Sequence, residues 1–414
     1  MRESSKRESN ADRPMKDRWN EHEAESYSQD PKALRVYTSR LLGQENDLVL
    51  QGGGNTSLKI DELDDTGTRL PALFVKGSGW DLGSIEEAGF ATLRLDPLLE
   101  LAQRETLTDS EMVQRQRLAM IDRRSPNPSV EAILHATIPF RYVDHTHADA
   151  VLAIMNTDHG EQKIKEIYGE RYLVIPYVMP GFKLARAVYE RTRHIDWDRY
   201  EGIMLMNHGV FTFSDDARES YSQMIRIATR AEAYLEDQGA KVCLDEPQQA
   251  SLESLEKIGQ TVSAIRGQAV DLNLDQSREA VGFSRHPELA KIATRGPLTP
   301  DHSIFAKRIP VILNENFSQS IESYASEYKS YFERNATPEL TQLDPAPRWA
   351  VWPGKGILSF GRDRAERKAI AAIALHTAKV IQLSEHLGGW KPLSESDIFD
   401  VEYWELEQAK LKKG

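Results

Sequence analysis

The chain has 414 residues, of which 40% are hydrophobic, and a formal net charge of −12. This length and composition predict a soluble globular protein with enough residues for two ordinary domains. The acidic balance argues against a nucleic-acid-binding surface, although it leaves room for a locally basic pocket that holds an anionic substrate. The single cysteine, Cys243, excludes an intramolecular disulfide and a thiolate cage, so a tight transition-metal site must use histidine and carboxylate ligands.

The N-terminal thirty residues are polar and charged. They lack the apolar core of a secretory signal, and no apolar run in the chain approaches the roughly 18 to 20 residues of a membrane helix. We therefore expect residues 1–30 to form a poorly ordered arm. The expected compartment is the cytoplasm, and neither a membrane nor a nucleic acid is expected as a partner.

Secondary-structure signals begin at Lys32. We predict a helix for LRVYTSRLLG that ends at Gly43, a glycine-rich turn and strand for QGGGNTSLKI, and a strand that breaks into a Gly/Ser loop for ALFVKGSGWDLGSI. Further on, we predict a helix with Ser129 as its N-cap for PSVEAILHATI, a strand for YVDHTH, and a strand, a turn and a strand for GIMLMNHGVFTF. Strands and helices thus alternate, as in an α/β fold.

A long helix is predicted for SDDARESYSQMIRIATRAEAYLED. Its apolar residues recur at spacings of three, four or seven and should face the core: Tyr221, Met224, Ile225, Ala228 and Leu235. After about Glu246 the composition shifts to polar helix formers and the motifs end. We therefore predict a catalytic domain over 31–245, followed over 246–414 by a helical linker and a smaller, non-catalytic α/β region.

The second region contains a possible internal repeat. Two segments are similar to each other: the earlier IMLMNHGVFTFSDDARESYSQMIRIATRAEAYLED and the later WAVWPGKGILSFGRDRAERKAIAAIALHTAKVIQLSEH. Between them, Gly209 and Phe213 match Gly356 and Phe360 at a constant offset of 147. The alternative is that strand-turn-strand-helix units often look alike. Lys355 stands where His208 stands in the first copy, so a metal site in the first copy would have lost at least that ligand in the second.

Three histidines are candidate metal ligands. Residues i and i+2 of a strand face the same way, so His145 and His147 in VDHTHADA can direct both imidazoles at one ion. A third nitrogen can come from His208, which precedes a glycine expected in a tight turn. Three histidines with an open fourth position are typical of a catalytic zinc site, whereas an isolated H-x-H pair more often consists of structural residues.

Glu131 is the candidate general base. It lies four residues before His135, so on a helix both side chains would face the same side. A carboxylate close to a metal can accept protons if desolvation raises its pKa against the pull of the cation. The alternative role for Glu131 is to complement the helix dipole. We interpret His135 as a structural residue.

Two small-residue loops, GGGNTS and KGSGWD, predict a phosphate site. Their glycines expose backbone N–H groups, and Asn55, Ser57, Ser78 and Lys76 add further donors. Together with Ser129 these groups suit a phosphate monoester. Neither loop has the P-loop pattern or a G-x-G-x-x-G, and glycine-rich hairpin turns are common.

The order of these motifs resembles the class II aldolase/adducin N-terminal family over about Lys32 to Glu236: GGGNTS, GSG, PSVE, HTH and NHG with its amphipathic helix. The resemblance implies an α/β/α-layered fold with a central mixed β-sheet flanked by helices, followed here by the degenerate repeat-like α/β region. It implies one zinc ion per subunit on His145, His147 and His208, and Glu131 as the acid/base. It also implies that the substrate phosphate contacts Asn55, Ser78, Gly79 and Ser129, and that Tyr177 is the tyrosine a neighbouring subunit lends to the site.

The whole chain further resembles the aldolase portion of bacterial bifunctional rhamnulose-1-phosphate aldolase/alcohol dehydrogenases. That resemblance implies a metal-dependent aldehyde-lyase that cleaves a ketose 1-phosphate, L-rhamnulose 1-phosphate, into dihydroxyacetone phosphate and L-lactaldehyde. It also implies a homo-oligomer, a tetramer by resemblance. The chain has no G-x-x-x-G-x-G nucleotide loop in a strand-turn-helix setting, so we expect any oxidation of the aldehyde to belong to a separate short-chain dehydrogenase.

Other activities of the same fold remain as alternatives. Sugar-phosphate epimerases use an aspartate near the position of Glu131, which argues against them, whereas the dehydratases retain a glutamate. An adducin-like, non-catalytic interaction module typically lacks the metal histidines, all three of which are present in this sequence.

Overall fold

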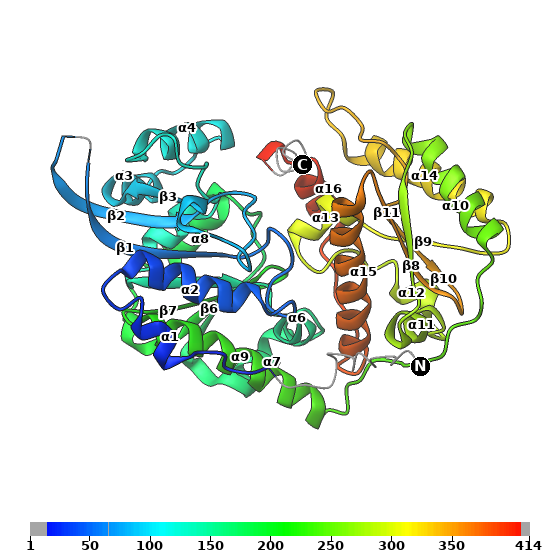
Figure 1. The fold of residues 1–414 in the computed structure, drawn as a ribbon, viewed down its shortest axis with the longest axis horizontal. Coiled ribbons are helices and arrows are strands. Elements are labelled where there is room, and N and C mark those ends of the chain that lie inside the picture. Colours follow the sequence, from blue (N-terminus) through cyan, green and yellow to red (C-terminus); the bar gives the residue numbers. More distant parts are fainter. Residues whose placement is uncertain (1–14, 65, 407–414) are drawn as a thin grey trace, which may run out of the picture.

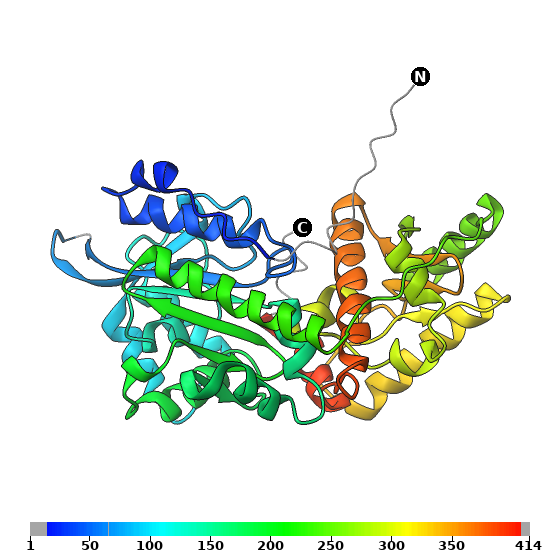
Figure 2. The same cartoon turned by 90° about the horizontal axis from the view of Figure 1, so that it is seen from below.

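The protein was analysed as a computed structural model that describes residues 15–64 and 66–406. Two α/β regions lie on either side of the long helix α15 (Arg364–Glu385), as two perpendicular views show (Figures 1 and 2). Within the described ranges, no helix combines the length and the apolar character that crossing a bilayer requires.

The first region is built on a seven-stranded mixed sheet with the order β3-β2-β1-β4-β7-β6-β5. Only β5 and β6 are parallel neighbours, and the other adjacent pairs are antiparallel. The strands are β1 (Asn55–Leu63), β2 (Arg69–Lys76), β3 (Phe90–Arg94), β4 (Tyr142–Thr146), β5 (Tyr172–Ile175), β6 (Gly202–Leu205) and β7 (Gly209–Ser214).

Helices cover both faces of this sheet, and strand β7 next to its centre carries buried apolar side chains on both sides. In β7, Val210 packs against one face, and Phe211 and Phe213 pack against the other. The first face is covered by α2 (Pro31–Gly43), α6 (Asp149–Met155), α7 (Gly160–Tyr168) and α9 (Ala217–Asp237). The second is covered by α3 (Leu95–Ala102), α4 (Asp109–Ala119), α5 (Ala132–Thr137) and α8 (Phe182–Thr192).

These elements confirm the predicted layered α/β fold. Helix α2 ends at Gly43, as predicted. All five apolar residues predicted to face the core from α9 are buried: Tyr221, Met224, Ile225, Ala228 and Leu235.

The second region contains a four-stranded sheet with the order β8-β11-β10-β9. Its strands are β8 (Asp271–Asp275), β9 (Val311–Ile312), β10 (Trp349–Trp352) and β11 (Gly356–Gly361). Besides α15, its helices are α10 (Leu252–Arg266), α11 (Arg278–Ser284), α12 (Leu289–Ile292), α13 (Pro300–Ala306), α14 (Phe317–Asn335) and α16 (Glu395–Glu402).

The predicted internal repeat is present in the structure. The sheet β8-β11-β10-β9 has the same sequence of pairings as β4-β7-β6-β5, namely antiparallel, antiparallel and parallel. The hairpin register is also repeated at the offset of 147 residues that the sequence showed. The pairs Gly202–Thr212 and Leu205–Gly209 of the first hairpin correspond to Trp349–Ser359 and Trp352–Gly356 of the second.

The predicted arm needs a correction. Residues 1–14 lie outside the described residues, but residues 15–30 are ordered and contain α1 (Glu21–Glu25). The Trp19 ring packs against Tyr37 of α2 and Tyr221 of α9, with centroids 5.6 and 6.5 Å away, and the backbone N–H of Met15 donates to Glu232 Oε2 at 2.8 Å. The expectation of disorder was wrong for 15–30 because a few large apolar side chains hold this polar segment in place.

Candidate metal centre

Three buried histidines converge at one end of the first sheet. His145 is on β4, His147 follows the last residue of that strand, and His208 is in the turn between β6 and β7. Each offers a ring nitrogen, and the three nitrogens lie within 4.8 Å of one another. The Nε2 atoms of His145 and His147 are 3.2 Å apart, so the two rings converge as predicted for residues i and i+2 of a strand. They do so although the strand itself, β4, ends at Thr146.

The surrounding backbone orients these rings. The Nδ1 atom of His145 lies 3.0 Å from the carbonyl oxygen of Val210. A carbonyl oxygen only accepts, so Nδ1 carries the proton and the Nε2 lone pair of His145 faces the other two rings. Three imidazole nitrogens arranged in this way fit a divalent metal ion of the zinc type.

Gly209 allows the backbone to pass directly behind two of the rings. A Cβ atom at this position would lie 2.4 Å from the carbonyl oxygen of Thr146 and 2.9 Å from ring carbons of both His145 and His147. The sequence suggested a glycine in a tight turn. The structure shows in addition that no larger residue fits beside these rings.

Glu131 lies between the histidines and the first glycine-rich loop. Its Oε1 is 3.5 Å from Nε2 of His208, and its Oε2 is 3.6 Å from Nε2 of His145. Oε2 also accepts a hydrogen bond of 2.6 Å from Nδ2 of Asn55. This carboxylate is therefore placed to exchange a proton with a molecule bound beside the three rings.

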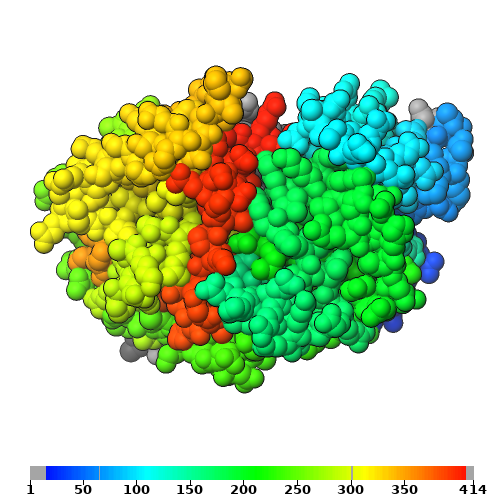
Figure 3. Space-filling model, turned by 180° about the vertical axis from the view of Figure 1, so that it is seen from behind, coloured from blue at the N-terminus to red at the C-terminus, as the bar shows by residue number. Residues whose placement is uncertain are grey.

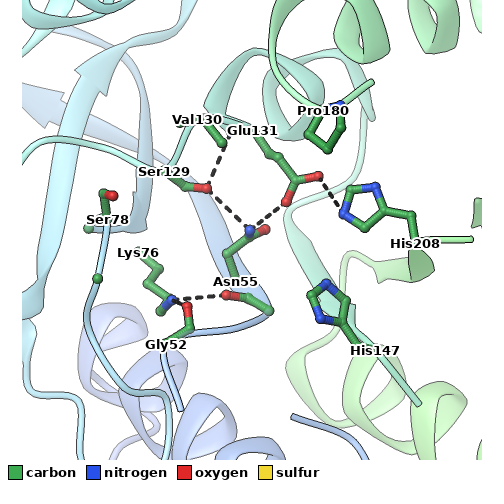
Figure 4. A pocket seen from close by; sticks show the side chains of 13 residues that line it. Gly52, Asn55, Lys76, Ser78, Ser129, Val130, Glu131, His147, Pro180 and His208 are labelled. Atoms are coloured by element: carbon green, nitrogen blue, oxygen red, sulfur yellow. Dashed lines mark hydrogen bonds and ion pairs between the residues drawn. The ribbon is translucent and has the colours of Figure 1, made fainter. Parts of the chain in front are cut away.

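The start of the helix after Glu131 differs from the prediction. Helix α5 begins at Ala132 with Glu131 as its N-cap residue, whereas Ser129 was the predicted N-cap. Ser129 lies in the preceding turn, where its Oγ accepts a hydrogen bond of 3.3 Å from the Glu131 N–H. The turn places Ser129 and Glu131 side by side at the pocket (Figure 4).

A buried hydrogen-bonded chain extends from Glu131 through Asn55 and His135 to Ser57. His135 Nε2 contacts Asn55 Oδ1, and His135 Nδ1 lies 2.8 Å from Ser57 Oγ. Burial, and then the positive charges around the ring, hold the pKa of His135 well below its usual value, so the ring is neutral. Nε2–H therefore donates to Asn55 Oδ1, and Ser57 donates to Nδ1. Sequence reasoning missed this contact, although the spacing of four from Glu131 placed both side chains on one face.

One pocket contains most of the predicted site residues (Figure 4). Its lining residues are Gly52, Gly54, Asn55, Lys76, Gly77, Ser78, Gly79, Ser129, Val130, Glu131, His147, Pro180 and His208. All four predicted phosphate contacts are in this set, beside Glu131 and two of the histidines. Lys76 donates to the carbonyl oxygens of Gly52 and Gly54 at 3.0 and 2.9 Å and so fixes the glycine-rich loop.

Two predicted residues lie elsewhere. Ser57, considered as a phosphate donor, is buried against His135. Tyr177 is not among the described residues that line the pocket. The Tyr177 hydroxyl is buried, and this burial, with the carboxylates of Asp397 and Asp400 on α16, raises the pKa of Tyr177.

The second copy of the repeat lacks the three histidines. The strand registers place Leu274, Gln276 and Lys355 at the positions of His145, His147 and His208. The sequence had predicted the loss of the ligand at Lys355, and the register shows that the other two are also replaced.

Comparison with known families identifies the chain. The family described as "Class II Aldolase and Adducin N-terminal domain" matches residues 33–235, and that described as "Aldolase class II, second domain" matches residues 249–411. The chain belongs to the class II aldolase family. Class II aldolases are generally metal-dependent, and His145, His147 and His208 form a possible metal site in this member of the family.

Individual relatives of this chain include an uncharacterized oxidoreductase, YuxG, of Bacillus subtilis (strain 168). It is 32% identical over 94% of this chain, and this chain spans 60% of its length. The N-terminal class II aldolase domain of a conserved Thermoplasma acidophilum protein is 41% identical and covers 53% of this chain and 99% of its own, with a TM-score of 0.48. L-Fuculose-1-phosphate aldolase from Thermus thermophilus is 15% identical and covers 49% of this chain and 95% of its own, with a TM-score of 0.32.

Proposed function

We propose that this class II aldolase is a zinc-dependent lyase that cleaves a ketose 1-phosphate, L-rhamnulose 1-phosphate, into dihydroxyacetone phosphate and L-lactaldehyde. The observation that carries the proposal is the single pocket in which Glu131 lies between the three histidines and the small-residue loops. One end of this pocket offers hydrogen-bond donors to a phosphate, and the other offers metal ligands and a proton-transfer group.

Each part of the pocket has a role in the proposed reaction. Asn55, Ser78, Gly79 and Ser129 would hold the phosphate, so that its binding energy fixes the reacting carbons. A zinc ion on the three histidines would supply Lewis-acid stabilisation of the negative charge that develops on the substrate oxygens. When the C3–C4 bond breaks, its electron pair stays on the three-carbon fragment, and the C4 hydroxyl would give its proton to the carboxylate of Glu131. Glu131 would then deliver a proton to C3.

The aldehyde side of the reaction needs a further group. We propose Tyr177 from a neighbouring subunit of a homo-oligomer to orient the aldehyde oxygen, as the resemblance to the family implies; this requires its hydroxyl, buried in the single chain, to become accessible at the subunit interface. We likewise propose that oxidation of L-lactaldehyde belongs to a short-chain dehydrogenase. The glutamate at position 131 also suits a sugar-phosphate dehydratase, which makes dehydration the second candidate reaction.

The decisive experiment measures dihydroxyacetone phosphate released from L-rhamnulose 1-phosphate by the purified protein. Release should stop when a chelator removes the metal and should return when zinc is added back. Glu131→Gln should retain zinc but turn over about 10²- to 10⁴-fold more slowly, the usual contribution of a general base.

The control substitution changes a glutamate that does not line the pocket. Glu161→Gln changes an exposed glutamate on α7 and should leave the rate unchanged. Normal turnover by Glu131→Gln would remove Glu131 from the mechanism. A zinc-loaded protein that releases no dihydroxyacetone phosphate but forms a dehydrated product would replace the lyase by the dehydratase.

A further inference from the structure

The second region lacks the metal ligands, yet it packs directly against the segments that carry them. Helix α15 lies along α6, which begins two residues after His147, and the chain that follows α15 reaches the turn that carries His208. In the space-filling view, the C-terminal segment fills the seam between the two regions (Figure 3).

The first contact is a cluster of charged groups that we call the α15 charge cluster, consisting of the buried Asp149 and His376 and the half-buried Asp47 and Lys379. His376 Nδ1 lies 2.5 Å from Asp149 Oδ2, and Lys379 Nζ lies 2.7 Å from Asp47 Oδ2. His376 and Lys379 are one turn apart on α15 and face the two carboxylates together. The ammonium group of Lys379 supplies positive charge to the two carboxylates, so the cluster does not need a metal ion to balance them. It is an ion-pair network between the two regions.

The α15 charge cluster connects to His147 through the backbone. The N–H of Asp149 donates to the carbonyl oxygen of Asp47 at 2.8 Å, and the N–H of His147 donates to that of Leu48 at 2.9 Å. The segments 47–48 and 147–149 are therefore bound to each other, and the two carboxylates at their ends are bound to α15. Without His376, the buried carboxylate of Asp149 would keep only Lys379, 3.9 Å away, and would lose its hydrogen bond to α15, so we expect this segment to shift.

The second contact supports the turn that carries His208. Asn207 has a φ of 54°, a left-handed conformation that a non-glycine residue keeps only when its surroundings hold it. Its N–H donates to Asn156 Oδ1 at 2.8 Å, and its Nδ2 donates to the carbonyl oxygen of Lys391 at 3.2 Å. The N–H of Lys391 donates in turn to the carbonyl oxygen of Asn156 at 2.8 Å. Asn207 is thus held between α6 and the segment that follows α15.

We propose that the second region positions the metal site, through His376 for His147 and, for His208, through the Lys391 carbonyl oxygen that Asn207 binds. The inference rests on the proposed metal-dependent function, and it gives the region without ligands a defined role. The two contacts act on different ligands from different sides, so a loss of either should distort the metal site without removing a ligand.

The test is a titration with Co²⁺, a visible probe of a zinc-type site, of the full chain and its variants. The readouts are the dissociation constant, from competition with a chromophoric chelator, and the visible d–d absorption of the bound ion. We expect His376→Leu and Asn207→Gly each to bind Co²⁺ about tenfold or more weakly, the lower end of the range for losses around metal ligands; glycine keeps the positive φ of position 207 and removes only the side-chain contact with Lys391. We also expect a changed d–d spectrum.

Glu366→Gln is the matched control. Glu366 is also on α15, in a buried ion pair of 2.9 Å with Arg266, about 15 Å along the helix from His376. This variant should lower the melting temperature but keep the Co²⁺ affinity within twofold of that of the wild type. His376→Gln, which keeps a hydrogen-bond donor for Asp149, should recover part of the affinity and serves in place of His376→Leu if that variant does not fold.

The outcomes separate this inference from the proposed function. If the wild-type chain binds Co²⁺ and both His376→Leu and Asn207→Gly bind it equally well with an unchanged spectrum, the positioning role is overturned and the metal site stands. A wild-type chain that binds no Co²⁺ overturns the metal site itself, and the positioning role with it.

Discussion

Gly209 is the residue at which the fold and the metal site constrain each other most directly. A methyl group at this position would overlap a backbone oxygen that cannot rotate away, as well as the rings of His145 and His147. We expect Gly209→Ala to weaken zinc binding at least tenfold and to lower the free energy of unfolding by about 1 to 3 kcal/mol, as overpacking does. Metal titration and urea unfolding measure the two effects.

Gly259→Ala is the control for that substitution. In α10 the added Cβ would meet only Leu272 Cδ1, at 3.7 Å, which is ordinary van der Waals contact. Alanine is favoured over glycine in a helix by about 0.5 to 1 kcal/mol, so this variant should be slightly more stable and should bind zinc normally. Unchanged zinc affinity in Gly209→Ala would show that the strand can shift without moving the rings.

His135 was interpreted from the sequence as a structural residue, and the structure gives it a larger role. By donating to Asn55 Oδ1 it fixes the amide so that Nδ2 faces Glu131. His135→Leu would let this amide rotate, and we expect kcat to fall about 10- to 100-fold, as for other losses of supporting hydrogen bonds. The zinc content should stay at the wild-type level, because His135 is not a ligand. A variant with full kcat would return His135 to a purely structural role.

At the scale of elements, the sequence predicted what short-range patterns determine. Helices α2 and α9, strand β4 and the β6–β7 hairpin follow from periodicity and glycines within each segment, and the offset of 147 predicted the second hairpin. The contacts that it could not predict join residues far apart in the chain. His376 lies 227 positions from Asp149, and no local pattern indicates that the two meet.

The segment that contains α1 illustrates the same limit. Its composition is that of a solvated arm, but Trp19 packs on Tyr37 and Tyr221 and thereby joins α2 to α9. We expect Trp19→Ala to lower the free energy of unfolding by about 2 kcal/mol, less than for a fully buried aromatic residue because Trp19 is partly exposed. Urea unfolding measures this loss. A variant of unchanged stability would restore the view that residues 15–30 contribute nothing to the fold.

At the scale of the whole molecule, the two regions share their main hydrophobic core. The cluster that contains Met204 and Val210 of the first sheet also contains Trp349 and Val351 of the second, with α15 residues such as Ile373 and Ala374. Separating the regions would expose this apolar surface to water, which is unfavourable in proportion to its area. The regions are therefore expected to fold and unfold together, and a change in the second region should alter the stability of the whole chain.

The pH dependence of stability tests a buried group of the second region. Lys307 is 3% exposed, its Nζ lies 3.4 Å from the centre of the Tyr328 ring, and burial lowers its pKa from 10.5 to about 7. Between pH 7 and 10.5 the unfolded chain therefore binds a proton that the folded chain does not, so stability rises with pH in this window, by up to about 1.4 kcal/mol per unit. Lys307→Met removes this contribution. The difference in unfolding free energy, wild type minus variant, should increase by about 2 kcal/mol from pH 7 to 9 in urea titrations. A difference that stays constant would mean that Lys307 keeps its proton in the folded protein, stabilised by the carboxylate of Glu402.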